Sequence, residues 1–332
     1  MTQDFTVIDG CAFTEGAFIG LSETVKKSSL NAFFLTTPGE DAGLEDCATR
    51  IGRIYNLADD PQNGIKVVRN VADLKQAKAE HKIGVILAFQ NPYSIQNSID
   101  KLRAFYELGI RVIQMTYNKL NYIGAGCTEP NDYGLSDFGR CMLCEMNRIG
   151  IVADISHSGY QTSYDVLKYS EKPVVFSHAG AMSVTRNPRN KNDELLLMLK
   201  ENNGVIGLSP WGPLCWKPEE KRRPTLSDYV DHIDHVVDLI GIDHVGFGGD
   251  STLDDTKDEQ GTVTQATLYA AVVADYDKYV GTHPSVRHAV DVDGVWQIEN
   301  VFAEMRKRGY SEEDISKFAG GNFLRVLTAN WK

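Results

Sequence analysis

Two short segments that both end in Ser-His constrain the fold of this chain more than any other feature. Residues 150–157 and 172–178 are each an apolar run that closes on a histidine, His157 and His178. Such runs are typical of buried strands. The residues between them, 160–170, are enough for one crossover helix, which makes the two strands parallel neighbours. Both histidines are therefore expected at the carboxyl ends of adjacent strands, where parallel α/β folds bind ligands.

The rest of the chain repeats this alternation of strand and helix. Further strands are expected at residues 5–10, 30–37, 82–90, 110–118, 203–211 and 244–250, with helices between most of them. Eight strands in such a series favour a closed (β/α)₈ TIM barrel, formed as one domain by residues 1–332. No Gly-x-Gly-x-x-Gly pattern follows the first strand, which argues against a dinucleotide-binding domain. Three extra C-terminal helices, at 295–308, 311–318 and 322–330, are expected to pack outside the barrel.

Composition and charge exclude several classes of partner. The chain has 332 residues and a net charge of −11, which argues against nucleic acid and anionic membranes as partners. No apolar run is long enough to cross a bilayer, and no signal peptide is visible at the N-terminus. A cytoplasmic location is expected. The six scattered cysteines indicate reduced thiols, and Cys141 and Cys144, a CxxC within a helical pattern, are expected to be packing residues.

The expected strand ends gather a set of metal-ligating side chains at one mouth of the barrel. Two imidazoles, His157 and His178, and the carboxylate of Asp250 suit zinc or a similar divalent ion. Asp250 could take a proton from an activated water and pass it to a leaving nitrogen; the alternative is a structural acid. Gln90 could add its amide oxygen as a neutral ligand, or only form hydrogen bonds.

Other residues near the same mouth suggest how a substrate would be held. The guanidinium of Arg189 suits a substrate carboxylate, whereas Arg186 is expected on the surface. Tyr117 and Asn118 end the fourth expected strand and are candidates for substrate contact. Tyr122, Trp211 and Trp216 are expected near the same mouth, where they could line an apolar pocket, face a cationic group of the substrate, or only pack loops. Histidines expected to be structural, or without a partner at ligand spacing, are His232, His235, His244, His283 and His288.

A series of motifs in order along the chain carries a resemblance to a known family. They are Gly134-Leu-Ser-Asp-Phe-Gly139, Glu145-Met-Asn-Arg-Ile-Gly150, Asp154-Ile-Ser-His157, Phe176-Ser-His178, Pro188-Arg-Asn190 with Asp193, Asp231-His-Ile-Asp234, residues 240–250 and Gly320-Gly-Asn-Phe-Leu-Arg325. With these motifs the chain resembles the membrane (renal) dipeptidase family. That family consists of zinc peptidases on a (β/α)₈ barrel within the amidohydrolase superfamily.

The resemblance implies a metal site, and the chain departs from it at three positions. Family members carry two zinc ions. The histidine ligands of the second zinc ion match His157 and His178. The family's aspartate after strand eight matches Asp250, and its arginine that binds the substrate carboxylate matches Arg189. The His-x-Asp pair of the first site is here Cys11-Ala12-Phe13, the bridging Glu is Gln90, and a substrate-contacting His is Tyr117. The first zinc site is therefore expected to be absent, which leaves about one zinc, or another divalent ion, per chain.

Two functional hypotheses remain open from the sequence. The first is a mononuclear hydrolase that cleaves the C–N bond of a small, carboxylate-bearing or dipeptide-like substrate. The second is a family member that has lost dipeptide hydrolysis and binds a small ligand or catalyses a lyase-type step. For Cys11, a soft metal ligand, a nucleophile and an inert thiol all remain open. The family also implies a homodimer.

Overall fold

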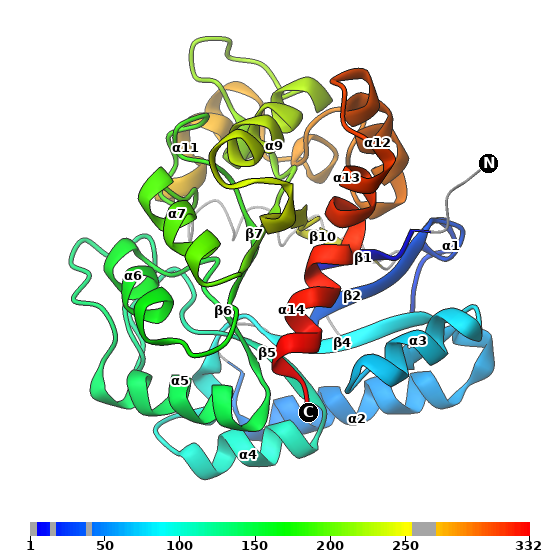
Figure 1. Ribbon diagram of the computed structural model, residues 1–332, viewed down its shortest axis with the longest axis vertical. Coiled ribbons are helices and arrows are strands. Elements are labelled where there is room, and N and C mark those ends of the chain that lie inside the picture. The colour runs from blue at the N-terminus through cyan, green and yellow to red at the C-terminus, as the bar shows by residue number, and fades with distance from the viewer. Residues whose placement is uncertain (1–4, 14–17, 38–41, 254–269) are drawn as a thin grey trace.

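A closed parallel barrel forms the centre of the molecule. The computed structural model describes residues 5–13, 18–37, 42–253 and 270–332 (Figure 1). Eight strands pair in parallel in the order β1-β2-β4-β5-β6-β7-β8-β9, and the pairing of β9 with β1 closes the sheet. Their bounds are β1 Val7–Phe13, β2 Leu30–Thr36, β4 Ile83–Phe89, β5 Ile110–Gln114, β6 Val152–Asp154, β7 Val175–Ala179, β8 Val205–Leu208 and β9 Val245–Phe247. The predicted (β/α)₈ barrel is confirmed.

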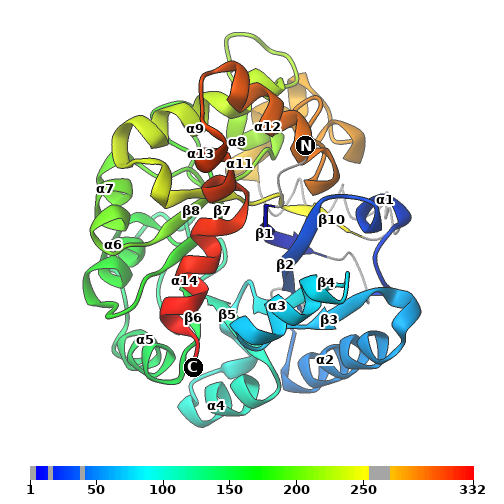
Figure 2. The same cartoon turned by 45° about the vertical axis from the view of Figure 1, so that its right-hand side comes forward.

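Helices surround the sheet on its outer side (Figure 2). The helices that precede the C-terminal region are α1 Glu23–Lys26, α2 Leu44–Asp59, α3 Val71–Ala79, α4 Ile99–Glu107, α5 Asp137–Ile149, α6 Tyr160–Tyr169, α7 Asp193–Glu201, α8 Gly212–Cys215, α9 Leu226–Ile240 and α11 Ala270–Tyr279. Local sequence sets their ends. The Ser136 side chain accepts a hydrogen bond from the backbone of Gly139 at the start of α5, and Gly150, in the left-handed conformation, ends it.

Two very short strands were not expected from the sequence. β3, Ile65–Val67, pairs with β4 outside the closed barrel, and β10, Ser251–Thr252, extends the edge beside β1. Two or three residues carry too little alternation for a strand pattern to be recognised. Neither strand changes the order of the barrel.

The last helix closes the floor of the barrel, which corrects the expectation that the C-terminal helices all pack outside. α12, Ile298–Lys307, and α13, Glu312–Ser316, lie on the outer layer, whereas α14, Asn322–Asn330, crosses the barrel (Figures 1 and 2). Its Phe323 joins one buried cluster with residues at the starts of strands, such as Val152 and Val175. A Cβ atom at Gly10 would lie 2.7 Å from the Phe323 ring, so glycine is required there.

The floor helix determines which end of the barrel is open to ligands. Because α14 covers the amino-terminal ends of the strands, the carboxyl ends face the opposite side, where the loops that follow the strands meet.

Among the described segments, no helix combines the length and the apolar character that crossing a membrane requires.

Candidate metal centre

Two neighbouring strands bring the Nε2 edges of a pair of imidazoles together. His157 follows β6, and His178 lies within β7, the next strand of the barrel. Their Nε2 atoms are 3.0 Å apart, and both side chains are buried. Two nitrogens bound to one zinc ion would be about 3.3 Å apart in tetrahedral geometry. The spacing of the two rings therefore fits a shared ion.

Hydrogen bonds behind the two rings determine which nitrogen of each ring faces the other. The Nδ1 atom of His157 lies 2.7 Å from Oδ1 of Asn118, which can only accept. The Nδ1 atom of His178 lies 2.7 Å from the hydroxyl of Ser177, and that hydroxyl donates to Asp154. With these partners each ring would hold its proton on Nδ1, so that the Nε2 lone pairs of the two rings face each other.

Two opposed lone pairs at this distance repel each other unless a cation lies between them. A proton is disfavoured there, because burial lowers the pKa of both imidazoles well below its usual range, and the nearby positive charges of Arg189 and Lys191 lower it further. Neutral imidazole with its second nitrogen held by a hydrogen bond is the form that binds metal ions. The residues present therefore fit a divalent ion.

A thiol and a carboxylate complete the cluster from the opposite side of the mouth. One ligand atom each of Cys11, His178 and Asp250 lie within 4.8 Å of one another. The Cys11 thiol lies 3.8 Å from Oδ1 of Asp250, and Nε2 of Gln90 donates to its sulfur at 3.3 Å. Burial raises the pKa of the Cys11 thiol and of the Asp250 carboxyl. The predicted ligand Gln90 therefore reaches the cluster, with its amide nitrogen directed to the sulfur.

Backbone geometry holds Asp250 at this position. Its φ angle of 50° is left-handed, a region that Asp and Asn tolerate better than most residues. Its amide donates to the carbonyl of Cys11 at 2.9 Å, which ties the ends of β9 and β1 together. The Nε2 atom of His288 lies 3.0 Å from the Asp250 carbonyl oxygen and 3.1 Å from that of Gly249. No spacing in the sequence indicated His288, because it returns to the mouth from a distant segment.

Two buried cations lie beside the imidazole pair. Arg189 is 2% exposed, and its guanidinium donates to the carbonyl oxygens of Ser156 and His178. No carboxylate in the described part of the chain forms an ion pair with it. Lys191, also 2% exposed, donates to the carbonyl oxygen of Ser158, and burial lowers its pKa to about 7. Sequence reasoning missed Lys191, which only its burial distinguishes from a surface lysine.

Two of the remaining predicted residues lie next to the imidazole pair. Tyr117 stacks on the ring of His157, with centroids 4.2 Å apart, so it contacts the imidazole pair directly. Asn118 is buried behind His157.

Three other predicted residues lie away from the imidazole pair: Arg186, which is exposed, Trp216, which packs on Tyr276, and His232, which accepts a hydrogen bond from the Ala181 amide. Cys141 and Cys144 are both exposed, so the expectation that they pack inside is wrong: they lie on the outer face of α5.

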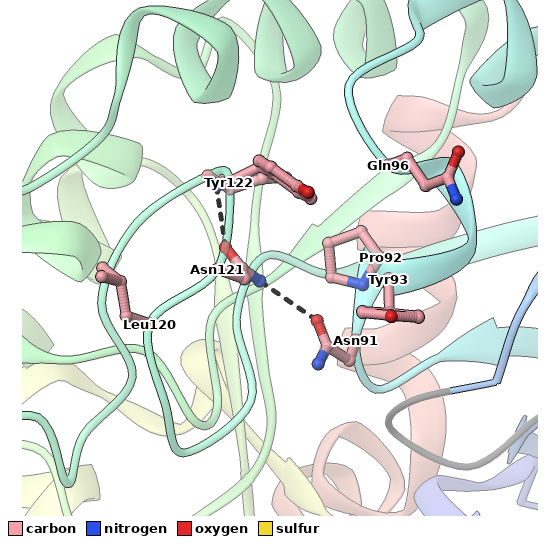
Figure 3. Close-up of a pocket in the computed structure, with 8 residues that line it drawn as sticks. Asn91, Pro92, Tyr93, Gln96, Leu120, Asn121 and Tyr122 are labelled. Carbon is pink, nitrogen blue, oxygen red and sulfur yellow. Dashed lines mark hydrogen bonds between the residues drawn. The ribbon is translucent and has the colours of Figure 1, made fainter.

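A separate pocket opens beside the mouth. It has a volume of about 350 Å³, and it is lined by residues that follow Gln90 and Asn118 in the chain, among them Tyr93 and Tyr122. Asn121 bridges its two loops by donating to Asn91 at 3.1 Å (Figure 3). Of the aromatic residues named from the sequence, Tyr122 thus lines a pocket.

Comparison with known proteins decides the family. A family model described as membrane dipeptidase (peptidase family M19) matches residues 21–275. The chain belongs to the membrane dipeptidase family. The match begins after β1, so Cys11 lies outside it.

Curated relatives and a solved structure agree with membership of the membrane dipeptidase family. The chain is 31% identical over 280 residues to dipeptidase verJ of Clonostachys rogersoniana, covering 84% of this chain and 63% of that protein. It is 31% identical over 290 residues to dipeptidase tcpJ of Claviceps purpurea, covering 86% and 60%. The chain thus spans about three fifths of the length of these relatives. An amidohydrolase from Pseudomonas aeruginosa is 32% identical, with a TM-score of 0.86 and coverage of 99% and 97%.

A more distant structure shares the fold of this membrane dipeptidase family member. A metallopeptidase from Rhodobacter sphaeroides, solved with a phosphinate mimic of the dipeptide L-Ala-D-Ala, has a TM-score of 0.78 at 20% identity and covers 98% of this chain and 99% of that one. At that identity the similarity shows the barrel alone.

Removing the hydrogen bond behind His157 is expected to weaken metal binding. In Asn118→Ala the ring loses the acceptor that holds its proton on Nδ1, and loss of such a partner typically costs about 10- to 100-fold in metal affinity. Competition titration with a zinc chelator measures the change. Asn118→Asp keeps the acceptor and should retain the affinity, and Asn121→Ala, in the loop next to it, is the control. Unchanged affinity in Asn118→Ala would show that the side chain does not orient the ring.

Proposed function

We propose that the chain is a metal-dependent hydrolase that cleaves the amide C–N bond of a small, carboxylate-bearing substrate. One divalent ion, zinc by analogy with the family, would be held between His157 and His178. The observation that carries this proposal is the pair of Nε2 atoms, from neighbouring strands, that face each other at 3.0 Å. The curated relatives named dipeptidases support a peptide-like substrate.

Each residue of the site has a distinct part in the proposed reaction. A bound divalent ion supplies an activated water at neutral pH and polarises the carbonyl that is attacked. Asp250 accepts the proton that leaves the water and returns it to the departing nitrogen. The raised pKa of this buried carboxyl, nearer to neutrality than that of an exposed one, suits a group that both takes and gives a proton.

Arg189 is proposed to bind the carboxylate of the substrate. Within the described residues the guanidinium donates to two backbone carbonyls and forms no ion pair, and a substrate carboxylate would supply a negative partner. The Tyr117 ring, stacked on His157, forms a wall beside the ion. Together these residues would place the amide bond of a dipeptide-like molecule over the imidazole pair.

The alternative is a family member without peptidase activity. It is favoured by the observation that residues at all three places of departure from the family pattern lie at the site: Cys11 and Gln90 contact each other, and Tyr117 stacks on His157. Such a protein would bind a small carboxylate ligand or catalyse a lyase-type step. It would use the same divalent ion, and Arg189 would still bind the carboxylate.

Hydrolysis of dipeptides with a free or an amidated C-terminus tests the proposal. The zinc-loaded protein should cleave some L,L- or L,D-dipeptides, and Arg189→Met should raise KM by about 10- to 100-fold, since a hydrogen bond to a charged group contributes roughly 1.5–3 kcal/mol. The amidated substrates lack the carboxylate, so the substitution should affect them little. Arg186→Met, an exposed arginine in the same loop, is the control.

Two results would oppose the proposal. Equal losses on acid and amide substrates would mean that Arg189 supports the backbone at Ser156 and His178 and does not bind the carboxylate. Tight binding of dipeptides by the zinc-loaded protein with no cleavage would favour the non-peptidase alternative.

A further inference from the structure

We infer that Cys11 is a metal ligand: the sulfur of Cys11 binds the ion together with His157 and His178, and Gln90 supports that sulfur as a hydrogen-bond donor. The inference rests on the proposed function, because it concerns the same ion. The site would then combine one thiolate with two imidazoles. The Cys11 sulfur, and not the amide oxygen of Gln90, would be the third ligand.

The spacing of Cys11 and His178 supports this coordination, and His157 joins it through its Nε2 atom, 3.0 Å from that of His178. In a tetrahedral zinc site with bonds of about 2.3 Å to sulfur and 2.0–2.1 Å to nitrogen, sulfur and nitrogen would be about 3.6 Å apart. The ligand atoms of Cys11 and His178 are within 4.8 Å of each other. A shortening of up to about 1 Å, which side-chain rotation can supply, would bring the sulfur to the expected spacing from the His178 nitrogen.

The charges of the site require an anionic ligand at this position. Both imidazoles are uncharged with a single ring proton, and Gln90 brings no charge, so among the residues proposed to touch the ion only Asp250 would offset the dication; Asp9 and Asp154 are buried farther back and hydrogen-bond to protein groups. Arg189 and Lys191 are buried close by and add positive charge. An uncompensated charge in such an interior is costly. A Cys11 thiolate beside Asp250 would balance the two charges of the ion itself, and a coordinating thiol is deprotonated by the bound cation.

The orientation of Gln90 supports a sulfur ligand. Its Nε2 atom donates to Sγ of Cys11 at 3.3 Å. An N–H directed at a thiolate stabilises the negative charge on sulfur, as partners behind metal ligands commonly do. Because its amide nitrogen donates to Cys11, Gln90 would stabilise the sulfur ligand and would not bind the ion itself.

Three ligands from the protein leave one coordination position open, as in catalytic zinc sites. The Cys11 sulfur lies 3.8 Å from Oδ1 of Asp250, so the carboxylate borders that open position. A thiolate with two imidazoles also predicts the kind of metal: zinc and cobalt should bind in preference to magnesium or manganese, which favour oxygen ligands.

Cobalt substitution tests the inference without relying on activity. A thiolate bound to Co²⁺ gives an intense charge-transfer band in the near ultraviolet. The full chain loaded with one equivalent of cobalt should show this band, and Cys11→His should bind cobalt without it. Cys11→Ser should bind zinc at least about 100-fold more weakly. Loss of a residue that only hydrogen-bonds to a metal ligand costs less than this. The control is Cys141→Ser, which removes an exposed thiol on the outer face of α5.

X-ray absorption on the zinc-loaded wild type provides a second measurement that needs no variant. It should show one sulfur at about 2.3 Å among lighter neighbours at about 2.0–2.1 Å. Zinc bound with only nitrogen and oxygen neighbours, or cobalt bound without the band, would overturn the assignment of Cys11 and leave the proposed function intact. A chain that binds neither ion would overturn both.

Discussion

Replacing His157 by alanine is expected to remove both the bound ion and the activity. The variant loses one of the two facing Nε2 atoms, so the remaining ligands hold the ion far more weakly. Without the ion the reaction loses several kcal/mol of stabilisation of the transition state, which corresponds to a loss of roughly 10³-fold or more in kcat/KM. Metal analysis of the purified variant and single-substrate kinetics measure the two effects.

The matched control for this change is another imidazole on the same barrel. His235 pairs with Asp193 on the outer layer, so His235→Ala should keep the metal content and the activity. If His157→Ala retained a full equivalent of metal and its rate, the ion would not lie between the two histidines, and the proposed chemistry would lose its basis.

Replacing Asp250 by asparagine is expected to leave the ion bound but slow the reaction. The amide cannot accept the proton of the attacking water, and loss of a general base or acid typically costs about 10²- to 10⁴-fold. Asparagine is the least disruptive substitution at this position, because it tolerates the left-handed φ of 50°. The expected result is therefore a lower kcat with one equivalent of metal retained and an unchanged melting temperature.

A surface carboxylate provides the comparison. Asp243, whose side chain is 62% exposed, should tolerate replacement by asparagine without loss of rate. If Asp250→Asn lost the metal together with the activity, Asp250 would act as a ligand. If the rate stayed the same, a group other than Asp250 would move the proton.

The sequence alone identified the barrel and the strand ends that carry the candidate site. Strands such as β4, apolar at every position, and helices such as α5, with Ser136 and Gly150 at its ends, are recognisable from a few neighbouring residues. The alternation of these elements and the rule that parallel strands point the same way then placed His157, His178 and Asp250 at one mouth. Each step depends on local pattern, which is why it succeeds without coordinates.

Other features depend on contacts between distant segments, and only the tertiary structure decided them. Gln90 meets Cys11 across 79 residues of chain, and the sequence did not show which end of its amide would face the sulfur. His288 returns to the backbone of Asp250, and α14 lies under the barrel instead of outside it. The physical reason is that such contacts arise when the barrel closes and its ends are packed, and no repeating pattern within either segment encodes them.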